Sequence, residues 1–213
     1  MAGGNNEGIF ALVNFGWNDE PKGSPLRWHT EDPETDPWEW RMRLLEERDD
    51  VAYGKVFFRK GGFITKEWYP YFLAVRRQGR DFEDEYEDGL ISYEGKRIYQ
   101  VVSEVEKLSL DEIKRVAGFD KEDKSKFDRG LVELQMKMYL TMCGRQQRMS
   151  SKGAGHGWSS TVFCTTERFF GEEVFEEAKG MSKERAMEAI TKQVLRLNPE
   201  ANNKKIKKFV EGS

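Results

Sequence analysis

The amino-acid sequence predicts an α+β fold that is mostly helical. Apolar residues recur at helical spacing through much of the chain, and short segments rich in β-branched and aromatic residues lie beside glycine-rich stretches, as hairpin strands do. A length of 213 residues and an aromatic content of 13% allow a sizeable buried core. The uncharged apolar stretches fall far short of the roughly 20 residues that cross a bilayer, so we expect a soluble, cytoplasmic protein.

The N-terminal region is predicted to contain a helix followed by a β-hairpin. Asp36 suits the N-cap position, a proline follows it, and Glu39 lies at capping-box distance, which together predict a helix over 37–47. The next segment, 51–58, has the composition of a strand. Because two glycines follow at 61–62 and apolar residues resume after them, we predict a hairpin with its turn at these glycines.

A second helix is predicted after Thr65, with its regular part beginning near Pro70, since a proline there removes one helical hydrogen bond. Six carboxylates follow within 81–88. Paired carboxylates can hold a metal or act as acid and base, but a charge run more often forms the solvated face of a helix. We therefore expect Phe82 and Tyr86 to face inward and the carboxylates to face solvent. The many aromatic residues of this half would fill the core or line a pocket that stacks a flipped base.

The stretch 97–165 has the most informative pattern. Helical spacing predicts one helix at its start, a short second helix capped by Ser109, and a third helix with Phe127 on its inner face. The pattern then becomes that of strands at 138–144 and 158–165, with a loop of small residues between them. This order predicts a winged helix-turn-helix, in which the third helix enters the major groove of DNA and the hairpin, or wing, touches the backbone.

The charge distribution favours this stretch as a DNA-binding module. Between residues 96 and 168, 14 Lys and Arg stand against 10 Asp and Glu, a balance of +4, whereas the whole chain carries −3. Basic side chains at the start of the third helix and on the wing can neutralise phosphates, although acidic residues among them argue against strong non-specific binding. The predicted DNA-binding residues are Lys124, Ser125, Lys126, Arg129, Arg145, Arg148 and Lys152.

The two cysteines and two histidines lack the spacing of a zinc site, so we expect neither a metal nor a cofactor. If the wing is symmetric about residues 153–154, Cys143 faces Cys164 on the opposite strand. We expect these thiols to pack as small hydrophobic groups, because a disulfide is unfavourable in a reducing cytosol.

The motifs DPETDPWEW, YGKVFF, GFITKEWYPYF and GWSSTVFCTTERFFG resemble those of a family of small bacterial proteins described as AlkZ-related. The resemblance extends from about Glu31 to the C-terminus. It implies a distant relation to the AlkZ class of DNA glycosylases, which are built from winged-helix units and unhook alkylated or crosslinked bases.

Those glycosylases use a motif of two glutamines around one apolar residue, in which a glutamine positions the attacking water. The comparable string here is Gln135-Met136-Lys137, in which Gln135 matches the first position and Lys137 departs from the second. The resemblance therefore makes Gln135 the candidate catalytic residue. The alternative is a polar residue at a helix end that bonds to the backbone.

We predict three regions that form one compact body: an N-terminal α/β-hairpin region (1–95), the winged helix-turn-helix (96–170) and C-terminal helices (171–213). The predicted function is that of a DNA-binding winged-helix protein with a regulatory or repair role, whose partner is double-stranded DNA. The alternatives are a glycosylase-like base-repair enzyme and a protein-interaction module that has lost DNA binding. We expect no association with a membrane, and a homodimer or a protein partner is compatible with the sequence.

Overall fold

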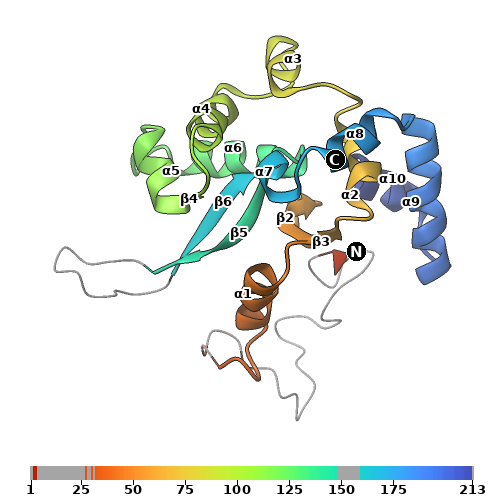
Figure 1. Ribbon diagram of the computed structural model, residues 1–213, viewed down its shortest axis with the longest axis horizontal. Helices are drawn as coiled ribbons and strands as arrows, with labels where there is room; N and C mark the ends of the chain where they lie inside the picture. Colours follow the sequence, from red (N-terminus) through yellow and green to blue (C-terminus); the bar gives the residue numbers. More distant parts are fainter. Residues whose placement is uncertain (1, 4–26, 28–29, 31, 148–158, 213) are drawn as a thin grey trace.

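The computed structural model describes residues 2–3, 27, 30, 32–147 and 159–212. In these residues helices surround an antiparallel sheet, which confirms the predicted mixture of helices and strands (Figure 1). Over this part of the chain the sheet has six strands, in the order β1-β3-β2-β5-β6-β4. No helix in the same part of the chain is long and apolar enough to cross a membrane.

The elements have the following bounds. The strands are β1 (Ala2–Gly3), β2 (Val51–Phe57), β3 (Lys60–Thr65), β4 (Leu108–Ser109), β5 (Leu140–Gln146) and β6 (Ser160–Thr165). The first helices are α1 (Pro37–Glu47), α2 (Tyr69–Arg76), α3 (Phe82–Glu87), α4 (Tyr93–Ser103), α5 (Leu110–Val116) and α6 (Lys124–Met136). The remaining helices are α7 (Thr166–Phe170), α8 (Glu173–Lys179), α9 (Lys183–Leu197) and α10 (Asn203–Glu211).

The turn between β2 and β3 lies earlier than the sequence predicts. The strands pair antiparallel, and Phe58 and Arg59 connect them with positive φ angles of 51° and 59°, as in a tight two-residue hairpin turn. The predicted turn at residues 61–62 is therefore wrong, because both glycines lie inside β3. Gly61 has a different role: a Cβ there would lie 2.1 Å from Tyr53 Oη, so only glycine leaves room for the tyrosine.

Most helix starts follow the sequence signals. α1 has the predicted bounds, and the Asp36 carboxylate accepts a hydrogen bond from the Trp38 N–H. Glu39 does not complete the predicted capping box, because its carboxylate pairs with a distant arginine instead. In α5 a capping box does form between Ser109 and Glu112. α2 begins beside its proline, as predicted.

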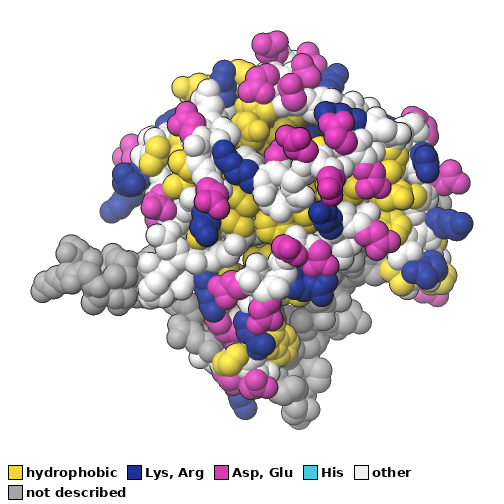
Figure 2. Space-filling view, viewed as in Figure 1, with side chains coloured by type: hydrophobic (Ala, Val, Ile, Leu, Met, Phe, Trp, Pro, Cys, Tyr) yellow, Lys and Arg dark blue, Asp and Glu magenta, His cyan; other side chains and the backbone are white. Residues whose placement is uncertain are grey.

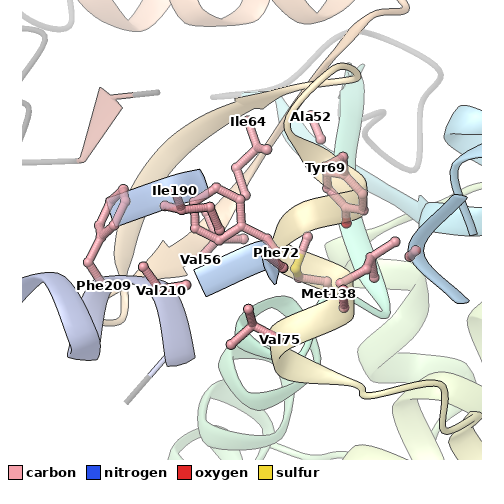
Figure 3. Packing of buried hydrophobic residues seen from close by; sticks show 14 of the residues in the cluster. Ala52, Val56, Ile64, Tyr69, Phe72, Val75, Met138, Ile190, Phe209 and Val210 are labelled. Atoms are coloured by element: carbon pink, nitrogen blue, oxygen red, sulfur yellow. The ribbon is translucent and has the colours of Figure 1, made fainter. Parts of the chain in front are cut away.

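Two large hydrophobic cores hold the elements together. One joins β2 and β3 to α2, α9 and α10, and Figure 3 shows their side chains converging. Here the rings of Phe57 and Phe209 stack at 4.1 Å, and Phe72 packs edge-on against both. The second core lies among α3, α4, α5, α6 and the strands β5 and β6. The buried aromatic residues in β2 and α2 therefore contribute to core packing.

α4, β4, α5, α6, β5 and β6 follow one another along the chain and share this second core. β4 pairs antiparallel with β6, where Leu108 is opposite Phe163. β5 pairs with β6 and also with β2, where Tyr53 is opposite Met142. The sheet therefore continues from the N-terminal strands into this segment. The boundaries of the three predicted regions stay a prediction.

The two cysteines are not directly opposite each other, so that prediction is wrong. Thr141 is the partner of Cys164, and the register shifts between Met142 and Gly144. Cys143 is thus the extra residue of a β-bulge. The assumption of a symmetric hairpin failed for two reasons: Arg145 pairs with Thr161, one residue away from the symmetric register, and the bulge displaces the pairs at the base of the hairpin by one residue more. Both cysteines are free thiols.

Candidate nucleic-acid interface

α6 has one exposed polar side and one buried apolar side, as its helical period predicts. Four of the predicted DNA-binding residues lie on the exposed side: Lys124, Ser125, Lys126 and Arg129. The buried side contributes Phe127, Leu131 and Leu134 to the second core. The basic residues at the start of α6 are therefore accessible from solvent.

The two lysines of this exposed side pair with carboxylates of the same segment. Lys124 Nζ lies 2.6 Å from Asp128 Oδ2, and Lys126 Nζ lies 3.0 Å from Asp123 Oδ1. The hydrogen bond from Lys126 holds the pKa of Asp123 below its ordinary value. Exposed pairs of this kind contribute little to stability because water screens them, so another anion can replace the carboxylate at little cost.

The exposed side of α6 is fixed in direction by close contact with α4. A Cβ at Gly130 would lie 3.0 Å from the backbone of α4, so the two helices approach as closely as glycine permits. Glu133 accepts hydrogen bonds from the backbone N–H of Ser92 at 3.1 Å and from its hydroxyl at 2.5 Å. On the exposed side, Arg129 donates to Ser125 Oγ at 3.0 Å.

Arg145 on β5 is held by two carboxylates of α1. Its guanidinium lies 2.7 Å from Glu39 Oε2 and 3.0 Å from Glu46 Oε1. The hydrogen bond to Glu39 raises the pKa of Arg145. α1 therefore lies against the base of the β5–β6 hairpin and neutralises its arginine. The predicted residues Arg148 and Lys152 lie outside the described residues.

Charges of both signs are mixed over the surface. On the face drawn in Figure 2, Lys and Arg side chains alternate with Asp and Glu side chains. The positive balance counted along the stretch 96–168 is thus compensated locally, both within α6 and between α1 and β5. Such a surface attracts DNA only weakly at long range, because fields of opposite sign cancel within about a Debye length.

Gln135 is buried near the end of α6, with both ends of its amide bonded to the backbone. Its Oε1 accepts a hydrogen bond from Lys55 N–H on β2 at 2.9 Å, and its Nε2 donates to the Leu131 carbonyl at 2.9 Å. A Cβ at Gly54 would lie 3.3 Å from Oε1, so the glycine gives the amide its space. Gln135 therefore links α6 to β2, and its role in positioning water stays a prediction.

Lys137 contacts a different element from Gln135. Its Nζ lies 2.8 Å from Glu85 Oε2 on α3, and the Glu85 side chain is only 3% exposed. The expectation that all carboxylates of 81–88 face solvent is therefore wrong at Glu85. Gln135 and Lys137, the two residues compared with the glutamines of the motif, therefore contact different elements, β2 and α3, and do not converge on one site.

In a comparison with known protein families, a family model described as AlkZ related matches residues 3–211. The chain belongs to the AlkZ-related family. The match spans nearly the whole chain and confirms the resemblance of its motifs. Comparisons with curated proteins and with solved structures gave no match.

Two buried arginines of this AlkZ-related protein hold the end of α6, and sequence reasoning missed them. The Arg76 guanidinium donates to the carbonyls of Met136 at 2.8 Å and Phe209 at 2.9 Å, and burial lowers the pKa of Arg76 to about 10. Arg77 donates to the Met138 carbonyl and pairs with Glu167 at 2.7 Å. The available signal was a pair of consecutive arginines in an otherwise apolar helix.

Proposed function

We propose that this AlkZ-related protein binds double-stranded DNA through a winged helix-turn-helix that runs from α4 to β6. The order of elements supports this proposal: helix, strand, helix, helix and a two-stranded hairpin, with β4 adding a third antiparallel strand beside β6. In such a module the third helix lies in the major groove and the hairpin contacts the backbone. The corresponding elements here are α6 and the hairpin β5–β6 (Figure 1).

The observation that carries the proposal is the exposed side of α6. Lys124, Lys126 and Arg129 lie on it, within the first two turns of the helix. The leading turns of a recognition helix are the part that approaches the bases and the flanking phosphates. Core packing does not require cations at these positions, because the opposite side of the helix makes the core contacts.

Binding would require the basic side chains to exchange partners. The carboxylates of Asp123 and Asp128 occupy the two lysines, and Glu39 and Glu46 occupy Arg145. A phosphate can replace an exposed carboxylate, but the carboxylate remains nearby and repels it. We therefore expect modest affinity that falls steeply as salt concentration rises, with Arg148 and Lys152 adding further contacts from the hairpin.

Fluorescence anisotropy with a labelled duplex at low salt tests the proposal. Lys126→Gln combined with Arg129→Gln should weaken binding at least about tenfold, because two phosphate contacts are lost. The matched control, Arg185→Gln combined with Lys192→Gln, removes the same charge from exposed positions of α9, on the opposite side of the molecule from α5 (Figure 1). Absence of binding, or equal loss in both variants, contradicts the proposal and favours a protein-interaction module.

Membership of the AlkZ-related family supports a second candidate, base excision of the glycosylase type. Gln135 would position the water, and its amide keeps one N–H and one lone pair beyond its bonds to Lys55 and Leu131. Release of a base from alkylated duplex by the wild-type protein, lost in a folded Gln135→Ala variant, would support this candidate. No release from alkylated or undamaged duplex would leave DNA binding without base excision.

A further inference from the structure

The bulge in β5 brings the two cysteines of the chain together. Thr141 is directly opposite Cys164, and Cys143 follows two positions later, so the cysteines are diagonal neighbours across β5 and β6. The two thiols lie close enough for each to shift the pKa of the other. Gly144, the residue after Cys143, has a φ of 148°, a conformation that glycine adopts readily and that lets the strand bend here.

The two thiols have different surroundings. Cys143 is half-buried, whereas Cys164 is only 5% exposed. The neighbouring Cys164 thiol lowers the pKa of Cys143, and the nearby Lys107 ammonium acts in the same direction, opposed by burial and by Glu106. The Cys143 thiol and burial raise the pKa of Cys164. The reachable sulfur is thus the one that ionises more easily, which is the arrangement of an attacking thiol beside a resolving thiol.

We propose that Cys143 and Cys164 form a site of reversible oxidation by peroxides, at which Cys143 reacts first and Cys164 closes a disulfide. The Cys143 thiolate attacks one oxygen of hydrogen peroxide, the O–O bond breaks, and the departing hydroxide takes up a proton to become water. Cys143 is then a sulfenic acid. The Cys164 sulfur attacks it, the S–O bond breaks, and the hydroxide leaves with the Cys164 proton as a second water.

Atoms and electrons balance over the two steps, since the two thiols lose two electrons and the peroxide gains them. The register makes the two cysteines diagonal neighbours, so side-chain rotation and a small shift of the bulged strand would bring the sulfurs to a bond length of about 2.05 Å. The disulfide would join β5 to β6 at the base of the hairpin, two residues before Arg145. A dithiol reductant reverses it by thiol–disulfide exchange. The inference does not depend on DNA binding.

Intact-mass spectrometry of the folded full-length chain tests the proposal. The reduced protein is exposed to a small excess of hydrogen peroxide, then denatured and treated with iodoacetamide. We expect both cysteines to lose alkylation together, the monomer mass to fall by that of two hydrogen atoms, and dithiothreitol to restore both thiols. Cys143 carrying two added oxygens beside an alkylated Cys164, or a disulfide only between two chains, would overturn the proposal.

Two variants test the order of the steps. Cys164→Ser should accumulate a sulfenic acid on Cys143 that a cyclic 1,3-dione traps, because no resolving thiol remains. Cys143→Ser should leave Cys164 at least about tenfold less reactive toward peroxide than Cys143 is in the wild type, because Cys164 is only 5% exposed and burial itself raises its pKa. Circular dichroism checks that both variants fold. Equal reactivity of the two remaining thiols would contradict the assigned order.

Discussion

Replacing Gln135 with alanine tests whether this amide is a structural link between α6 and β2. The change removes the acceptor for Lys55 N–H and the donor to the Leu131 carbonyl, each at 2.9 Å. The carbonyl loses little, because it remains within the α-helix. The Lys55 N–H loses its partner, at a cost of about 1–3 kcal/mol, and the space left beside Gly54 adds about 1 kcal/mol.

The expected loss of stability for Gln135→Ala is therefore about 2–4 kcal/mol, or a fall in Tm of roughly 5–12 °C for a chain of this size. Urea unfolding followed by far-UV circular dichroism measures it. The matched control is Gln100→Ala on the exposed side of α4, which should stay within about 0.5 kcal/mol of the wild type. If Gln135→Ala is as stable as this control, the structural link is refuted.

Three further changes test separate contacts. Glu39→Gln combined with Glu46→Gln should release Arg145, because it neutralises two carboxylates beside the proposed phosphate contact. The affinity for a duplex, measured by fluorescence anisotropy, should rise by up to about fivefold. Weaker binding would show that Arg145 does not reach the DNA. Gly130→Ala should lower stability to urea by about 1–2 kcal/mol, since the contact with α4 outweighs a helix-propensity gain of about 1 kcal/mol; a more stable variant would contradict this. Ser109 donates hydrogen bonds from its hydroxyl and its N–H to the Glu112 carboxylate, and they hold the pKa of Glu112 below its ordinary 4.5. Ionised Glu112 therefore stabilises the fold at pH values above 4.5, and this stabilisation is lost as the pH falls through the lower pKa of the folded state. Glu112→Gln should therefore make the free energy of unfolding depend less on pH in the acid range. The same pH dependence in the variant and the wild type would contradict this role of Glu112.

Local signals in the sequence predicted the helices well, because their causes are local. Asp36 and Ser109 cap the helices they precede, and the inner side of α6 follows its apolar spacing. The turn at Phe58 and Arg59 could not be predicted in the same way, because bulky residues rarely take positive φ and the neighbouring glycines are a stronger signal. Gly61 is needed for the room it leaves Tyr53, which is a tertiary requirement.

In the candidate site, too, the features with a local cause could be predicted and those that depend on tertiary packing could not. Helical period was enough to place Lys124, Lys126 and Arg129 on an exposed side of α6. It could not show that Arg145 pairs with Glu39, because 106 residues separate them and only the packing of α1 on β5 brings them together. The pairing of the cysteines was missed for a similar reason, since the register of the hairpin differs by one residue from the symmetric one and the bulge in β5 adds a second.

The salt dependence of duplex binding tests the central claim most directly. Four described cations are proposed to reach phosphates: Lys124, Lys126, Arg129 and Arg145. With a slope of about −0.9 per phosphate, the logarithm of the binding constant should fall with the logarithm of salt concentration with a slope of about −3 to −4 or steeper. Lys126→Gln combined with Arg129→Gln should reduce this slope by about 2. A slope near zero, or one that the double variant leaves unchanged, would contradict DNA binding through α6.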